Sequence, residues 1–322
     1  MLLKITIHAA RFFVGAMFVF SGFVKLVDPI GSQYKFEEYF SADVLDLTFL
    51  IPYALPFSVV LILAEIILGV LLLVGLKPKL VLQSILALTT LFLFLTWYSA
   101  FYDKVTDCGC FGDAIKLSPW ETFYKNIVLI AFIVFLLKQQ QHIKALGSVA
   151  FAKITTIVLS VGFGGLIYFV LTHLPVIDFR PYAVGKNISE GMVYQNDGKI
   201  PKVHDFSLES ATEDLTETLL QEEKVLLVLL YDLEKAPVAS YSAIKEITDK
   251  ALLKGYTVYG VSASFEGDLI LVQNQYDLPF EFLFCDATTL KTMIRATPGI
   301  MTLSKGTVTG KWHWIDAHKI SL

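Results

Sequence analysis

Five long apolar runs constrain the fold of this chain more than any other feature. They lie at residues 5–26, 54–76, 80–101, 122–138 and 154–174. Each run has about the length that a helix needs to cross a hydrocarbon core. Only 17% of the 322 residues are charged, well below the roughly 25% of soluble proteins. The sequence therefore predicts an integral membrane protein, and the first run is too long to be a removable signal peptide.

The apolar runs stop near Leu174, and this change predicts two regions of different class. The first is a mainly α membrane bundle, with four helices over residues 1–140 and a loop with a fifth helix over residues 141–176. A linker over residues 177–203 has turn residues and no sustained period. An α/β domain over residues 204–322 completes the predicted chain.

A strand, a helix and a strand begin the α/β domain. Residues 224–233, "KVLLVLLYDL", are typical of a buried strand. Residues 238–255 have helical spacing and end at a glycine, and residues 256–264 predict a second strand. We expect a right-handed crossover between these strands. Near the C-terminus, "SKGTV" predicts a hairpin.

This order of elements resembles the thioredoxin superfamily, in particular the periplasmic domains that follow membrane anchors. In "ATPGIMTLSKGTVTGKW", Thr297 and Pro298 take the place of the family's cis-proline segment. Where the family carries Cys-x-x-Cys, this chain has "YDLEKAPVASYS", and without a thiolate no disulfide can be attacked there. The resemblance therefore implies a module that binds a partner protein around Pro298. Cys285 ends an apolar run and is expected to be a buried structural residue.

Basic residues in short loops predict the orientation of the bundle. They gather within residues 4–11, 77–79 and 138–153, which fall on one side if the runs alternate across the membrane. That side is expected to be the cytoplasm. The N-terminus would then be cytoplasmic, and residues 103–114 and the C-terminal domain would lie in the oxidising periplasm of a bacterial inner membrane.

Three charged residues fall inside the first two apolar runs. Glu65 lies about 15 Å from the cytoplasmic end of the second run, where a charge costs of order 2.5 to 3.5 kcal/mol, so it should face the bundle interior. Its role is either a proton or quinone contact or a structural acid between helices. Lys25 and Arg11 have either a function or long side chains that reach an interface. Small residues that allow close helix contacts include Ser21, Gly22 and Gly69.

The stretch "DKVTDCGCFGDA" places Cys108 and Cys110 on either side of one glycine. Glycine permits the bend that a disulfide between residues i and i+2 requires, and such a strained ring is labile. Three alternatives therefore remain open for the two cysteines. They are redox exchange with Glu65 as an interior proton group, a structural disulfide, and a turn in which both thiols stay reduced. A metal site is not expected, because no histidine or further cysteine lies nearby.

Three segments together resemble the DoxX family, and within it the MauE-like branch, over residues 5–140. They are "RFFVGAMFVFSGFVKLVDP", "AEIILGVLLLVG" and "DCGCFGDAIKLSPWETFYKNIVLI". The fusion to a cysteine-free thioredoxin-like domain resembles DoxX proteins of Bacteroidetes. The family implies a role in maturing a disulfide-rich periplasmic enzyme, or in thiosulfate oxidation by quinone. The motif positions taken as candidate binding residues are Ser21, Gly22, Lys25, Glu65, Gly69, Trp120 and Asn126.

Three functions remain open from the sequence. The first is a membrane thiol-redox or electron-transfer component, with a quinone as candidate acceptor and Cys108 and Cys110 as the exchanging pair. The second is a non-catalytic scaffold that binds a periplasmic or membrane partner protein. The third is small-molecule binding or transport in the bundle around Glu65. Nucleic acid is not an expected partner, because no basic stripe is present and the net charge is −4.

Overall fold

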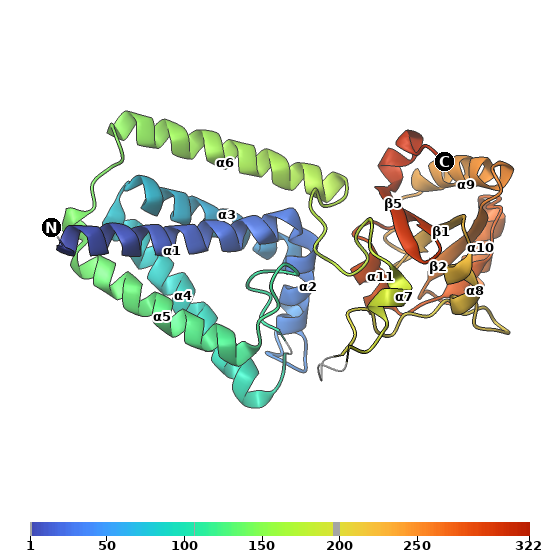
Figure 1. Cartoon of the computed structure of the whole chain (residues 1–322), viewed down its shortest axis with the longest axis horizontal. Coiled ribbons are helices and arrows are strands. Elements are labelled where there is room, and N and C mark those ends of the chain that lie inside the picture. Colours follow the sequence, from blue (N-terminus) through green and yellow to red (C-terminus); the bar gives the residue numbers. More distant parts are fainter. Residues whose placement is uncertain (1, 106, 196–199) are drawn as a thin grey trace. The chain divides into compact units, whose positions relative to one another are not determined.

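The computed structural model describes residues 2–105, 107–195 and 200–322. The chain divides into two units, Met1–Leu171 and Thr172–Leu322. The first is built of helices, and the second contains a mixed sheet with helices around it (Figure 1). This agrees with the predicted order of a helical membrane region followed by an α/β region.

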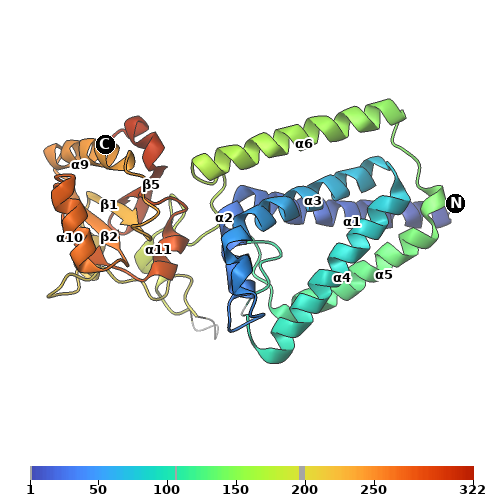
Figure 2. The ribbon, with the colours of Figure 1, turned by 180° about the vertical axis from the view of Figure 1, so that it is seen from behind.

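The predicted membrane spans are confirmed as helices. In the part of the chain that the structure describes, five helices are long and apolar enough to cross a membrane. The protein is therefore a multi-pass membrane protein with lipid-facing helices. Figures 1 and 2 both show α1 beside α3, and α4 beside α5. The five are α1 (Leu2–Val27), α3 (Ala54–Val74), α4 (Pro78–Tyr102), α5 (Pro119–Lys138) and α6 (Val149–Thr172).

A short helix, α2 (Pro29–Phe40), follows α1 and lies across its end (Figure 1). Its start is encoded locally, because the Asp28 side chain accepts a hydrogen bond from Gly31 N at 2.9 Å and Pro29 occupies the first turn. The Ser58 hydroxyl donates to Pro29 O at 2.9 Å, which ties this start to α3. The connection between the first two spans thus consists of α2 followed by the 3-10 turn η1 (Thr48–Tyr53).

Helices α1 and α3 approach closely because glycines face each other. A Cβ atom at Gly69 would lie 2.9 Å from Gly15 O and 2.9 Å from Val19 N. A Cβ atom at Gly22 would lie 2.5 Å from Ile66 Cγ1. Small residues of this kind let membrane helices pack backbone to backbone. The same approach brings polar side chains of α1 within reach of α3.

The Arg11 side chain is directed to the end of α3, where protein atoms bury it. Its side chain is buried and donates from Nε to Leu72 O at 2.8 Å, and from Nη2 to Leu73 O at 2.5 Å. A third bond runs from Nη1 to Lys144 O at 3.1 Å. The last carbonyls of a helix lack partners within the helix, and a cation near them is favourable. Arg11 therefore fastens the C-terminal end of α3.

The second unit is built on a sheet with the strand order β3-β2-β1-β4-β5. The first three strands are parallel, whereas β4 is antiparallel to β1 and to β5. The predicted strand–helix–strand unit is confirmed as β1, α9 and β2, and the predicted hairpin as β4 and β5. The strands are β1 (Val225–Leu230), β2 (Thr257–Ser262), β3 (Phe282–Phe284), β4 (Gly299–Ser304) and β5 (Thr307–His313). The helices are α7 (Ile188–Gly191), α8 (Thr216–Gln221), α9 (Ser240–Leu253), α10 (Glu266–Gln275) and α11 (Ala287–Met293).

Part of the segment predicted as a linker, residues 177–203, packs onto the second unit; residues 196–199 lie outside the described part. Asp178 accepts from Arg180 Nε within the segment at 2.7 Å, and from Lys311 Nζ of β5 at 2.6 Å, which ties the segment to the sheet. Burial by itself would raise the pKa of Asp178, but the two cations outweigh it and lower the pKa to about 2. Buried apolar residues of the segment are Tyr182, Ile188 and Val203.

The contact between α1 and α3 predicts unequal effects for the same substitution at two glycines. Gly69→Ala should destabilise the protein by about 1 to 3 kcal/mol, because the added methyl meets backbone atoms that cannot rotate away. Gly164→Ala in α6 is the matched control, since nothing lies within 4 Å of the Cβ position there. Thermal unfolding of the full chain in detergent measures both. Equal melting temperatures for the two variants would contradict the close contact.

Candidate functional site

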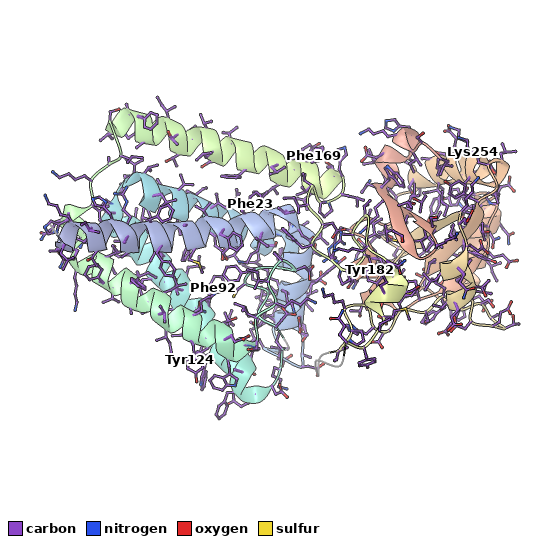
Figure 3. The ribbon with its side chains drawn as sticks, viewed as in Figure 1. Phe23, Phe92, Tyr124, Phe169, Tyr182 and Lys254 are labelled. Carbon is purple, nitrogen blue, oxygen red and sulfur yellow. The ribbon has the colours of Figure 1, made fainter. Side chains whose placement is uncertain are left out.

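A buried ion pair joins α1 to α3. Lys25 Nζ lies 3.0 Å from Glu65 Oε1 and 2.9 Å from Oε2, and the two residues are 5% and 2% exposed. Glu65 therefore faces the bundle interior as predicted. The alternative that Lys25 extends to an interface is wrong. Phe92 of α4 lies within the first unit (Figure 3), and its ring centre is 5.9 Å from Lys25 Nζ.

The same ammonium also holds the Cys-Gly-Cys loop. Lys25 Nζ donates to Ser21 Oγ at 2.7 Å and to Cys110 O at 2.8 Å. The Ser21 hydroxyl donates to Cys110 O at 2.9 Å. A buried ion pair is tolerated only when further hydrogen bonds satisfy its polar atoms, and the loop carbonyl supplies one of them. The loop position is thereby coupled to the pair between α1 and α3.

The loop turns sharply at its glycines. Gly109 and Gly112 have φ of +63° and +49°, a region that favours glycine. The Asp107 carboxylate accepts from Gly109 N at 3.0 Å and lies 3.2 Å from Lys35 Nζ. The turn brings the two cysteines together, since Cys110 N donates to Cys108 Sγ at 3.2 Å. Both are free thiols in the structure, so it represents the dithiol form of the predicted disulfide pair.

The two thiols differ in acidity because of their surroundings. A hydrogen bond from the Cys110 side chain is the main influence that lowers the pKa of Cys108, and despite opposition from burial the pKa falls to about 6. Thr122 Oγ1, at 3.1 Å from Cys108 Sγ, and the charge of Lys125 act in the same direction. The same thiol contact, together with burial, raises the pKa of Cys110. Cys108 is thus suited to act as a thiolate nucleophile, while Cys110 keeps its proton.

Sequence reasoning missed Thr122 and Lys125. A signal for the first was present, because "SPWE" forms a capping box in which Ser118 and Glu121 bond reciprocally and fix the first turn of α5. That turn presents Thr122 to the thiols. Lys125 lies one turn further on, with Nζ 4.5 Å from the centre of the Phe111 ring.

Two small cavities flank Cys110. One, of about 30 Å³, is lined by Ser21, Glu65, Cys110, Lys125 and Asn126 among others. The other, of about 50 Å³, is lined by residues of α1 to α4 and by both cysteines. A cavity of roughly 150 Å³ is needed to take benzene, so neither one fits a quinone ring with the side chains as they lie.

The structure brings some predicted site residues together and separates others. Four predicted residues lie around the two cysteines of the loop, Cys108 and Cys110. They are Ser21, Lys25, Glu65 and Asn126. Gly22 and Gly69 contribute to helix contact. Trp120 lies apart from this group, because its ring is 44% exposed and stacks on Tyr124.

The remaining predicted residues lie in the second unit. The Thr297–Pro298 peptide bond is cis, as the resemblance implied, and Thr297 Oγ1 donates to Asp232 O at 3.2 Å. Cys285 is fully buried, which confirms its prediction as a core residue. Within the described residues, no group of three or more His, Cys, Asp or Glu side chains could hold a metal ion.

The ion pair predicts strong coupling between two substitutions. Lys25→Met or Glu65→Gln alone should destabilise the protein by about 3 to 5 kcal/mol, because each leaves a buried polar or charged partner uncompensated. The double variant should recover most of that loss. A double-mutant cycle on thermal unfolding measures the coupling, and Glu246→Gln at an exposed pair should leave the melting temperature unchanged. Additive effects of the two single substitutions would contradict the pairing.

The thiol environment predicts a distinctive pH dependence of alkylation. Cys108 should react with iodoacetamide at a rate that is half-maximal near pH 6, because the thiolate predominates above its pKa. Cys285, whose burial raises its pKa to about 11, should remain unreactive at that pH. Peptide mass spectrometry of the folded protein measures both sites. Thr122→Val should move the Cys108 midpoint upward, and a native midpoint near the ordinary value of about 8.5 would contradict the assignment.

Comparison with known proteins connects this site to one family. The family model described as "Methylamine utilisation protein MauE" matches residues 3–139, which include α1 to α5 and the Cys-Gly-Cys loop. The match ends before α6 and the second unit. No curated protein and no solved structure matches the chain. The helical region that carries the candidate site is therefore similar to MauE, a family of membrane proteins.

Proposed function

We propose that the protein is a thiol–disulfide exchange component of a bacterial inner membrane that supports disulfide formation in a partner protein. The observation that carries the proposal is the unequal thiol pair, in which Cys108 is the acidic thiol and Cys110 the proton-retaining one. The family name adds support, because an accessory role in methylamine utilisation is consistent with maturing another protein.

The exchange balances without any group beyond the two proteins. A partner thiolate attacks Cys108 Sγ of the loop disulfide, and Cys110 leaves and takes up a proton. The partner's second thiolate then attacks the partner's first sulfur in the mixed disulfide. The bond to Cys108 breaks, and Cys108 leaves as a thiolate. A leaving thiol of low pKa departs faster, so the acidity of Cys108 favours this second step. The products are a partner disulfide, the loop dithiol of the structure, and one proton released from the partner's two thiols.

The loop disulfide must be formed again after each exchange. A disulfide of a second protein can do this by the reverse reaction, with Cys108 as the attacking thiolate. A quinone would supply the same two-electron chemistry, but the cavities beside Cys110 do not fit its ring, and we derive no step through it.

The distribution of basic residues supports the proposed orientation. Lys77 and Lys79 follow α3, and Lys144 follows α5. These two connections meet, because Leu146 N donates to Val74 O at 2.8 Å. Positive charge therefore gathers at one end of the unit, which is the expected cytoplasmic end. The Cys-Gly-Cys loop follows the opposite end of α4 and would face the periplasm.

The second unit is proposed to be a thioredoxin-like docking module. Its strand order supports that identity. The loop after β1 has no cysteine, and Cys285 is fully buried, so among its described residues no thiol is available for exchange. The unit would therefore hold a partner through the surface around Thr297 and Pro298, while the membrane loop provides the thiols.

Trapping of mixed disulfides tests the proposal. Cys110→Ser should accumulate reductant-sensitive adducts with partner proteins in cells, because Cys108 can form the mixed disulfide but no resolving thiol follows. Cys108→Ser should give none, and Cys285→Ser is the matched control that should behave like the native chain. Thiol-trapping electrophoresis and mass spectrometry of the adducts measure the outcome.

One result would replace this proposal with the scaffold alternative. In that case the native pair never changes redox state, the double variant Cys108→Ser with Cys110→Ser keeps full function in cells, and Thr297→Arg in the second unit abolishes it. Adducts restricted to Cys110→Ser would exclude that alternative.

A further inference from the structure

An unpaired donor lies beside the thiols. Asn126 of α5 is 2% exposed, and its Nδ2 has no hydrogen-bond partner among the described residues. A buried donor without a partner costs about 1 to 3 kcal/mol, so its retention at this point calls for a ligand. Asn126 lines the cavity of about 30 Å³ that also borders Glu65 and Cys110.

The size and lining of this cavity select the ligand. A water needs at least about 10 to 15 Å³ and two or more polar partners, so the cavity has room for one or two waters. Larger organic molecules do not fit. Asn126 offers a donor, the Glu65 carboxylate an acceptor, and Cys110 a thiol that must lose or gain a proton during exchange.

We infer that a water held by Asn126 Nδ2 carries the proton between the Cys110 thiol and the Glu65 carboxylate. This inference rests on the proposed exchange at Cys108 and Cys110. It assigns Asn126 as a positioning residue, and Glu65 as the group that accepts the proton when Cys110 attacks a mixed disulfide and returns it when Cys110 leaves.

The charges around the cavity favour this transfer. When the proton moves from Cys110 to Glu65, a thiolate replaces a carboxylate, and the total charge of the cavity does not change. Lys25 keeps an anion nearby, because it already bonds both Glu65 and the Cys110 carbonyl. When Cys110 attacks the mixed disulfide, its Sγ bonds to Cys108 Sγ and the bond from Cys108 to the partner sulfur breaks. The partner's leaving thiolate takes a proton from solvent.

A two-step reaction with a small disulfide tests the inference. The reduced full-length protein in detergent is mixed with 5,5′-dithiobis(2-nitrobenzoate), and each attack releases one coloured thiolate. The first release reports Cys108, and the second reports Cys110 resolving the mixed disulfide. Stopped-flow absorbance separates the two rates.

Asn126→Leu keeps the number and branching of the side-chain heavy atoms but removes the hydrogen-bond donor from the wall of the cavity. The first release should stay within twofold of the native rate, whereas the second should slow at least tenfold. The rate of the second release should also rise steeply with pH, since Cys110 must then lose its proton to hydroxide. Thr89→Val is the matched control: Thr89 lines the same cavity, but its hydroxyl already donates to Ile85 O at 2.8 Å, so both releases should match the native protein.

The other charged and titratable groups that face the thiols are unchanged in both Asn126→Leu and Thr89→Val. They are Lys25 of α1, Lys35 and Tyr39 of α2, Glu65 of α3 and Lys125 of α5. The double variant Lys25→Met with Glu65→Gln is an independent test if Asn126→Leu does not fold. It removes the proton acceptor without leaving a buried charge, and it should slow the second release to the same extent.

The outcomes separate the inference from the proposed function. The water relay is overturned if the second release is as fast in Asn126→Leu, or in the double variant, as in the native protein. Equal slowing of both releases in Asn126→Leu and Thr89→Val would attribute the effect to packing and also overturn it. If the first thiolate were released from Cys108→Ser at the native rate, the proposed exchange would instead be refuted.

Discussion

The buried ion pair between Lys25 and Glu65 is the interaction on which the rest of the first unit depends. Two charges in an apolar bundle are tolerated only when each is closely paired and further hydrogen bonded. The backbone approach at Gly22 and Gly69 brings α1 near enough to α3 for the pair to form. The Cys110 carbonyl completes the shell of the ammonium. Close helix packing thus allows the charges to pair, and the paired ammonium fixes the position of the loop.

This dependence explains why the two cysteines differ although only one glycine separates them. The carbonyl anchor buries Cys110, whereas the turn at Gly109 leaves Cys108 partly exposed beside Thr122. One thiol therefore donates the hydrogen bond that stabilises the other as a thiolate. A redox pair normally needs such a division between a nucleophile and a resolving thiol. Here it arises from tertiary contacts and not from the spacing of the motif.

The proposed function assigns chemistry to one unit and recognition to the other. The candidate thiols lie in the first unit, while the second unit has an α/β sheet whose one described cysteine is buried. The segment that follows α6 is part of the second unit, since Asp178 bridges Arg180 and Lys311. The proposed docking role needs a stable surface and no reactive group, which is consistent with the absence of cysteine from the loop after β1.

The sequence by itself determined the membrane helices, the strand–helix–strand unit and the burial of Cys285, because runs of apolar residues and their spacing act locally. It also identified Glu65, Lys25 and the two cysteines as residues that need an explanation. It could not pair Lys25 with Glu65, 40 residues away, or Ser21 with Cys110, 89 residues away. It also missed Thr122 and the packing of residues 177–203. Only the tertiary structure decided these, because a contact between distant residues depends on how close the backbones come, and close approach at glycines has no signature in local periodicity.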